Sequence, residues 1–205
     1  MNDTSEKTGP DVTGLFALAS GQAGYFRASQ ARTLGYSWEL LRHHAQTGRF
    51  IRKARGLYRL RDYPSTSRED VVAAWLRAGD RAVVSHESAL DIYGLSDVIP
   101  NAIHLTVPRS RRKLSPIQGV SVHTSTRPLK GADVLWREGV QVTAPARSIV
   151  DAAEAGTAPE QIVSAVHQAL DRGLTTPERL LGATKSRGQR VERLVRSALT
   201  SVAPN

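Results

Sequence analysis

Four polar side chains recur at helical spacing in the stretch 38–47. Glu39, Arg42, His43 and Gln46 stand at i, i+3, i+4 and i+7, so a helix carries all four on one face. Arginine pairs with guanine and glutamine with adenine, so this face has the chemistry of base recognition in the DNA major groove. The alternative is an ordinary solvent-exposed helix face.

A strongly basic segment follows directly, RFIRKARGLYRL over residues 49–60. Phe50 and Leu57, with Ile51 and Tyr58, are expected to anchor a two-strand hairpin that turns at 55–56. The hairpin leaves five basic side chains at its rim and tip: Arg49, Arg52, Lys53, Arg55 and Arg59. Like charges this close repel one another, and phosphate groups would remove that cost. The expected DNA-binding residues are therefore Ser37, Trp38, Arg42, His43, Gln46, Arg49, Arg52, Lys53, Arg55 and Arg59.

Two further helices are expected to position this face. Residues 11–20 have Val12, Leu15, Phe16 and Ala19 at the spacing of one buried stripe. A second, short helix is predicted over 30–34.

Capping residues set the limits of these helices. Ser29 is suited to cap the second helix, and Gly35 to end it in a left-handed conformation. Ser37 is suited to cap the third helix, and Gly48 ends it. Helix, turn, helix and basic hairpin is the order of a winged helix-turn-helix.

A turn-rich segment, 62–67, then marks a domain boundary. Ser67 and Ser85 are expected to cap the next two helices. Strands are predicted over 102–108 and 120–126, a hairpin turns at 138–139, and four helices follow, the last over 187–202. The predicted fold is α+β. Its expected divisions are a disordered lead-in (1–10), a winged helix-turn-helix domain (11–64) and a mixed α/β C-terminal domain (65–205).

Two more basic groups lie in the C-terminal part of the chain. The residues of this possible second basic surface are Arg109, Arg111, Arg112, Lys113, Lys185, Arg187, Arg190, Arg193 and Arg196. Each group is either a further phosphate contact or a solubilising flank, and the sequence does not favour one over the other.

Residue patterns of catalysis are absent from the sequence. It contains no phosphate-binding glycine loop, dinucleotide fingerprint or HExxH motif. Ser85, His86 and Glu87 are adjacent, and adjacent residues on a helix do not face each other. The six histidines (His43, His44, His86, His104, His123, His167) show no metal-ligand spacing. We therefore expect no catalytic residue, no metal and no cofactor.

The amino-acid composition limits the classes of partner that we expect. The hydrophobic fraction of 40% and charged fraction of 23% are ordinary for a globular protein, whereas the net charge of +9 favours a polyanion. The absence of cysteine excludes disulfides and cysteine-liganded zinc. No secretory signal and no apolar run of roughly 20 residues is present, so a cytoplasmic protein without membrane contact is expected.

Three segments in order resemble the AbiEi family of bacterial antitoxins. They are the ribbon RFIRKARGLYRL, the segment VVSHESALDIYGL and the segment VTAPARSIVDAAEAG. The resemblance runs from about Asp11 to the last helix. Ser148 is a mild departure, because threonine is commoner in the family at that place.

The resemblance implies an antitoxin of a toxin–antitoxin system. Its N-terminal domain would bind inverted repeats in double-stranded operator DNA and repress the operon. Its C-terminal antitoxin domain would counter a nucleotidyltransferase-like toxin, without a stable toxin complex. Two alternatives remain: a protein-binding module that caps a toxin directly, and a nucleic-acid-processing enzyme.

Overall fold

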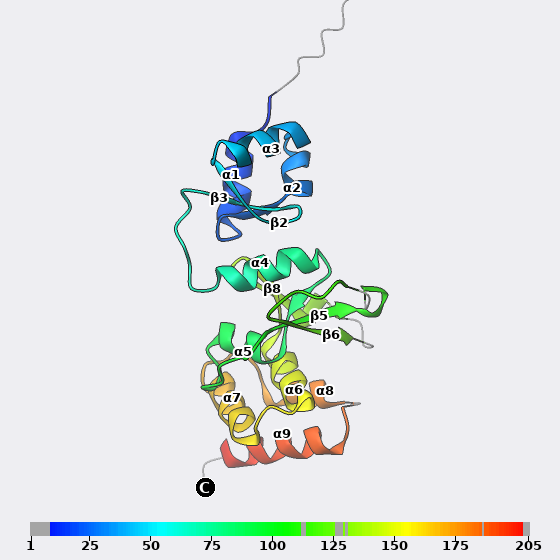
Figure 1. Cartoon of the computed structure of the whole chain (residues 1–205). Helices are drawn as coiled ribbons and strands as arrows, with labels where there is room; N and C mark the ends of the chain where they lie inside the picture. The colour runs from blue at the N-terminus through cyan, green and yellow to red at the C-terminus, as the bar shows by residue number, and fades with distance from the viewer. Residues whose placement is uncertain (1–8, 112–113, 126–128, 130, 186, 203–205) are drawn as a thin grey trace, which may run out of the picture. The chain divides into compact units, whose positions relative to one another are not determined.

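A computed structural model describes residues 9–111, 114–125, 129, 131–185 and 187–202 of the chain (Figure 1). The chain divides into two compact units, Met1–Arg77 and Ala78–Asn205. Both contain helices and strands, which confirms the predicted α+β class. Residues 1–8 of the expected lead-in lie outside the described residues. The boundary between residues 64 and 65 stays a prediction.

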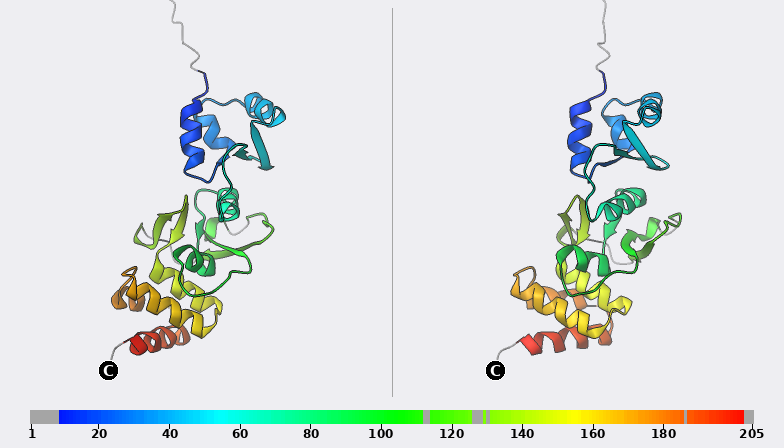
Figure 2. Two further views of the ribbon diagram at one scale, coloured as in Figure 1. Left: turned by 90° about the vertical axis from the view of Figure 1, so that its left-hand side faces the viewer. Right: turned by 60° about the vertical axis from the view of Figure 1, so that its left-hand side comes forward.

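The N-terminal unit begins with three short helices, α1 (Val12–Ser20), α2 (Ala28–Thr33) and α3 (Trp38–Gln46) (Figure 2). Asp11 caps α1 by accepting a hydrogen bond from the backbone N–H of Gly14 at 2.7 Å. Such caps satisfy backbone donors that have no partner inside the helix.

A three-stranded antiparallel sheet completes the N-terminal unit. Its strands are β1 (Tyr25–Arg27), β2 (Phe50–Ala54) and β3 (Leu57–Leu60), in the order β1-β3-β2. The hairpin β2–β3 follows α3 as predicted. The pairing of β1 gives β3 a neighbour on both sides, so β3 has no free edge.

Aromatic rings fill the core of this unit. The Phe26 ring meets the Phe50 ring edge-on at 5.0 Å between centroids and stacks on Tyr58 at 5.8 Å. The remaining buried members of this core are Leu15, Ala19, Ala28, Ala31, Tyr36 and Leu41. Offset and edge-on pairs are the arrangements that aromatic rings prefer, so the helices and the hairpin are held together at one centre.

Two details of the helices differ from the prediction. Val12 is 49% exposed and Phe16 59% exposed, so only half of the expected α1 stripe is buried. The second helix begins at Ala28, because the side chain of Gln30 accepts a hydrogen bond from the backbone N–H of Arg27 at 2.8 Å. Ser29 is therefore inside α2 and does not cap it.

Helix α4 (Glu69–Ala78) ends at the division between the units. Beyond it, a five-stranded mixed sheet has the order β6-β5-β4-β8-β7. Its strands are β4 (Val83–Val84), β5 (Ile103–Pro108), β6 (Val120–Ser125), β7 (Val134–Arg137) and β8 (Val140–Thr143). The pairs β5–β6 and β4–β8 are parallel, and the other two are antiparallel. The two long strands and the hairpin fall where they were predicted.

Five α-helices accompany this sheet: α5 (His86–Tyr93), α6 (Pro145–Ala155), α7 (Pro159–Asp171), α8 (Pro177–Thr184) and α9 (Gln189–Val202). Two single 3₁₀ turns, η1 (Arg109–Arg111) and η2 (Gly131–Asp133), join strands. Within this unit α9 lies farthest from the strands (Figure 2). Proline occupies the first turn of α6, α7 and α8, where its missing N–H costs nothing.

Buried hydrogen bonds fix α5 and α6 against the sheet. The Tyr93 hydroxyl, at the end of α5, donates to the backbone carbonyl of Thr143 on β8 at 3.0 Å. Ser148 on α6 donates to the same carbonyl at 2.8 Å. Gly94 ends α5 at φ +60°, a conformation that glycine adopts without steric cost. The end of α5 and the beginning of α6 are therefore held at one place beside β8.

Candidate nucleic-acid interface

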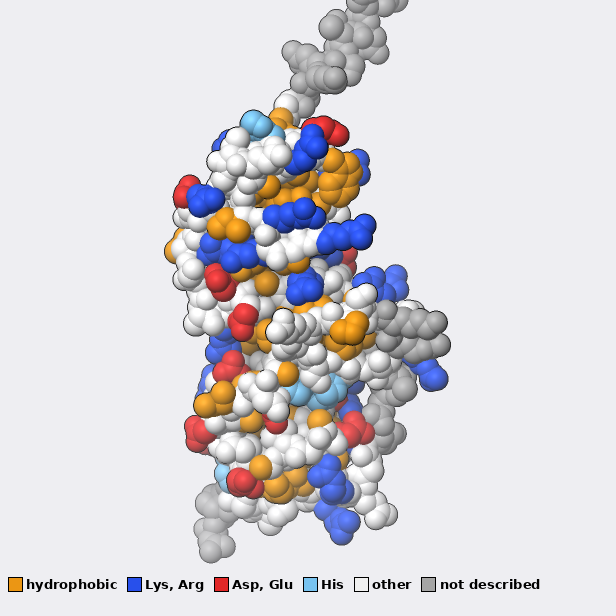
Figure 3. Space-filling model, in the orientation of Figure 1, with side chains coloured by type: hydrophobic (Ala, Val, Ile, Leu, Met, Phe, Trp, Pro, Cys, Tyr) orange, Lys and Arg blue, Asp and Glu red, His pale blue; other side chains and the backbone are white. Residues whose placement is uncertain are grey.

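A groove of about 960 Å³ lies between α3 and the β2–β3 hairpin. Its lining residues are Trp38, Arg42, Ala45, Gln46, Arg52, Arg55, Gly56 and Tyr58. Five of these eight belong to the expected DNA-binding set, which the fold thus brings together from two elements. Figure 3 shows Lys and Arg side chains around exposed hydrophobic side chains on the viewed face of the N-terminal unit.

The outer face of α3 has the predicted composition. Glu39, Arg42, His43 and Gln46 are exposed, whereas Leu41 on the opposite face is fully buried. A helix whose polar side is free and whose apolar side is anchored in a core presents its side chains at fixed spacing. That is the geometry that base reading in the major groove needs.

Ser37 holds the start of this helix. Its hydroxyl accepts a hydrogen bond from the backbone N–H of Leu40 at 3.1 Å, as predicted for the cap. Ser37 therefore acts through the helix, whose first residue, Trp38, is in the lining of the groove.

Trp38 is 53% exposed, which is unusual for the largest side chain. The guanidinium of Arg32, from α2, lies 5.2 Å from the centre of its ring in a cation–π contact. Arg32 is exposed and was not among the expected site residues. Its position beside Trp38 becomes visible only once α2 and α3 are packed.

The tip of the hairpin is as basic as predicted. Arg52, Lys53 and Arg55 are all exposed. The pairing of β2 with β3 shifts register between Arg52 and Ala54, which leaves Lys53 at a bulge. Gly56 makes the turn at φ +71°, which a side-chain-bearing residue adopts only with strain.

Arg59 is the exception, and its expected place at the rim of the hairpin is wrong. The residue is 5% exposed. Its guanidinium pairs with Glu69 of α4 at 3.1 Å and donates to the carbonyl of Tyr63 at 2.8 Å. The physical reason is that two neighbours cover its guanidinium: the ring of Tyr25, which is opposite Arg59 on β1, and Glu69 of α4. Arg59 holds the unit together and is not available to a phosphate.

The possible second basic surface is not one surface. Arg187 is buried and pairs with Asp151 and Glu154, so its assignment to a surface is wrong. Arg190 donates to the carbonyl of Ala153 at 2.6 Å, and Arg196 pairs with Glu192 at 2.8 Å.

The other residues of that set differ in their surroundings. Lys185, Arg109 and Arg193 are exposed. Arg111 donates to the carbonyl of Ala78 at 3.0 Å. Arg112 and Lys113 lie outside the described residues.

A polar cavity of about 300 Å³ lies in the C-terminal unit and was not expected from the sequence. It is lined by His86, Thr106, His123, Thr124, Ser125, Arg147, Asp151, Glu154, Ala155 and Arg187. The Asp151 carboxylate accepts two hydrogen bonds from Arg147, at 2.8 and 2.9 Å, and pairs also with Arg187. These residues come from α5, two strands, α6 and the segment before α9, so only the folded chain shows the site.

Histidines dominate one wall of this cavity. His86 and His123 stack with ring centroids 3.6 Å apart, and His104 lies next to His123 at 5.1 Å. The expected side-chain cap by Ser85 is wrong, because its hydroxyl is turned to His86 Nδ1 at 2.8 Å and accepts from Thr106 at 2.8 Å.

Burial favours the uncharged form of these three imidazoles. Burial, helped by the two neighbouring histidines, lowers the pKa of His86 to about 2. Burial also lowers the pKa of His104 and the pKa of His123 below their ordinary values. The sequence did not indicate this group of three histidines, because its members lie on a helix and two strands that are far apart in the chain.

Comparison with known families covers both units. A family model described as "Transcriptional regulator, AbiEi antitoxin" matches residues 15–61, and one described as "AbiEi antitoxin C-terminal domain" matches residues 82–201. This chain belongs to the AbiEi antitoxin family. The resemblance seen in the sequence is thereby confirmed. The first match contains every residue that lines the groove, and the second contains every residue that lines the polar cavity.

One solved structure of another protein has the same fold as this AbiEi family member. The crystal structure of the RV2827C protein from Mycobacterium tuberculosis matches with a TM-score of 0.59 over 92% of this chain and 75% of that chain. Its sequence identity is 16%, so the likeness concerns the fold alone. No curated protein matches in sequence.

As a member of this family, the chain is an antitoxin and transcriptional regulator. A helix-turn-helix type domain precedes its C-terminal domain. The family is a regulatory one. Among the helices of the described residues, none has the length and apolar character to cross a membrane.

Proposed function

We propose that the N-terminal unit of this AbiEi family antitoxin binds inverted-repeat operator DNA and represses its own operon. The observation that carries the proposal is the groove between α3 and the hairpin. It joins exposed Arg42 and Gln46, which have base-reading chemistry, to exposed Arg52 and Arg55, which have phosphate-binding chemistry.

The two elements have separate roles in this proposal. Helix α3 enters the major groove and offers Arg42, His43 and Gln46 to base edges. The hairpin tip offers Arg52, Lys53 and Arg55 to phosphates, which fixes the position of α3 but adds no base preference. Trp38, backed by Arg32, packs beside the sugar–phosphate backbone.

Gel retardation of the inverted repeats upstream of the gene tests the repressor role. The full chain is expected to shift this DNA at moderate salt more strongly than a random duplex of the same length. The matched control is Arg81→Ala, which removes an exposed arginine from the C-terminal unit and should not change the shift. If the folded wild-type chain does not shift the inverted-repeat DNA, the proposal is contradicted.

The C-terminal unit, in the same proposal, counters a nucleotidyltransferase-like toxin without forming a stable complex with it. The family description supports the antitoxin role of this unit. Co-expression with a toxin gene adjacent to this one is expected to restore growth. Growth that stays arrested, with the antitoxin present and folded, would contradict this part.

A second candidate is direct capping of the toxin by the C-terminal unit. It is favoured by Leu135 and Trp136 on the edge strand β7, which are 36% and 60% exposed. Exposed apolar side chains on a sheet edge are typical of a protein-binding surface. Co-purification at micromolar concentration that is lost in Trp136→Ser would establish capping, and clean separation of the wild-type proteins would exclude it.

A further inference from the structure

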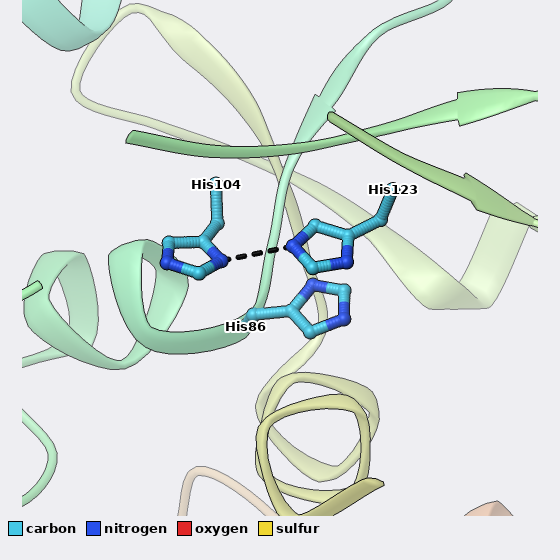
Figure 4. Close-up of side chains that lie close together, drawn as sticks. All are labelled: His86, His104 and His123. Carbon is cyan, nitrogen blue, oxygen red and sulfur yellow. Dashed lines mark hydrogen bonds between the residues drawn. The ribbon is translucent and has the colours of Figure 1, made fainter. Parts of the chain in front are cut away.

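Three histidine side chains meet in the C-terminal unit, and the proposed function uses none of them. One ring nitrogen from each of His86, His104 and His123 lies within 4.8 Å of the others. Figure 4 shows the three rings converging from the start of α5 and from two strands. His104 Nδ1 and His123 Nε2 share a hydrogen bond of 2.9 Å.

The fold creates this group through strand register. β5 and β6 are parallel, with His104 opposite Ser121 and Thr106 opposite His123. Residues two apart on a strand face the same side, so His104 and His123 are diagonal neighbours on one face of the sheet. His86 is the first residue of α5 and reaches over that face.

Packing alone does not account for the arrangement. His86 has φ +53°, a conformation rare for a residue other than glycine. Strained backbone costs stability, and it clusters at functional sites.

We propose that His86, His104 and His123 bind one divalent transition-metal ion, with Zn²⁺ the best match. Imidazole nitrogen is a preferred ligand of zinc, and three protein ligands with one open position make a common zinc geometry. Among the residues that the structure describes, no carboxylate joins the group, and the sequence has no cysteine. Asp151, a carboxylate in the lining of the cavity, is already held by Arg147 and Arg187.

Neighbouring groups are placed to orient the ligands. The Ser85 hydroxyl at 2.8 Å fixes one nitrogen of His86. Glu87 Oε2 lies 3.9 Å from His104 Nε2, and Thr157 donates to the other Glu87 oxygen at 2.8 Å. A carboxylate behind a ligand histidine sets its tautomer and raises its affinity for metal.

The three side chains must move to bind one ion, because their nitrogens lie up to 4.8 Å apart. Tetrahedral zinc with bonds of about 2.0–2.1 Å sets ligand nitrogens about 3.3 Å apart, close to the present spacing of His104 and His123. The near-parallel rings must also turn, and the terminal torsion of histidine is soft. His86 and His123 also line the polar cavity, so an ion held by the three histidines would lie at its wall.

The inference goes beyond the proposed function and does not depend on it.

Titration of the chelator-treated full chain with Zn²⁺, in competition with a chromophoric chelator, tests the site. We expect one ion per chain and a dissociation constant tighter than micromolar. Co²⁺ in place of Zn²⁺ should give visible absorption of tetrahedral intensity. Absence of stoichiometric binding, or binding only at millimolar metal, overturns the proposal.

Variants locate the ion. His86→Asn, His104→Asn and His123→Asn should each weaken binding at least about 100-fold, because even loss of an outer-shell partner costs about 10–100-fold. Glu87→Gln should fall within that smaller range and keep the Co²⁺ spectrum. The matched control is His167→Gln, which can still donate to the carbonyl of Ala198 and should bind as wild type. Unchanged binding in all three ligand variants overturns the proposal.

A wild-type measurement covers the case in which the ligand variants do not fold. In ¹H–¹⁵N spectra of the imidazole rings, three of the six histidines are expected to change on addition of Zn²⁺. Changes confined to other histidines, or in none, overturn the proposal without any variant.

Discussion

Arg59 shows how much the role of one residue depends on its neighbours. In the sequence it is one of five basic residues of a hairpin, equivalent to Arg52 and Arg55. In the fold it is buried and forms an ion pair with Glu69, while the other two stay exposed. The same residue type therefore supports the domain at one position and faces a ligand at the others.

Removal of the Arg59 side chain should lower the stability of the N-terminal unit. Arg59→Ala leaves the carbonyl of Tyr63 and the carboxylate of Glu69 without this donor. Loss of a partner from buried polar groups costs about 1–3 kcal/mol, so urea unfolding should show a decrease of that size. Arg49→Ala is the control, because Arg49 is exposed. Equal, small effects of both changes would contradict the structural role.

At the scale of elements, α3 was predictable because its signals are local. The polar face follows from a spacing of 3.6 residues, and the cap from a serine next to the first turn. The burial of Arg59 was not predictable in this way, since it depends on β1 pairing with β3. The histidine cluster depends likewise on the register of β5 and β6.

Loss of the cap tests how firmly α3 is held. Ser37→Ala removes the acceptor of the Leu40 N–H at 3.1 Å. N-cap substitutions of this kind cost about 0.5–2 kcal/mol. Thermal or urea unfolding should show that loss, with base preference on DNA retained. Ser29→Ala is the control, because Ser29 lies inside α2 and caps nothing. Stability equal to wild type in Ser37→Ala would show that the cap is not needed.

Metal binding tests the arrangement of the elements in the C-terminal unit. A ligand that binds only the folded chain stabilises it by about 2.7 kcal/mol at 100 times its dissociation constant. Zn²⁺ should therefore raise the midpoint of thermal unfolding of the wild type, and a chelator should reverse the rise. His104→Asn should show no rise. A zinc effect of equal size in that variant would place the ion elsewhere.

For the whole molecule, the excess positive charge predicts strong salt dependence. The net charge is +9, and the groove and hairpin tip gather exposed arginines in the N-terminal unit. If six phosphates are contacted, the logarithm of affinity falls against the logarithm of salt concentration with a slope of about −5. Fluorescence anisotropy over a salt series measures that slope. A slope near zero would show that phosphates are not the main contacts.

The division of labour between α3 and the hairpin is the central claim, and one measurement tests it most directly. The affinities of Arg42→Ala and Arg52→Ala are compared on the inverted-repeat operator and on a random duplex, at one salt concentration. Arg42→Ala should lose about 1–3 kcal/mol of preference for the operator, while Arg52→Ala weakens both duplexes alike. Equal effects of the two changes on both duplexes would contradict the account.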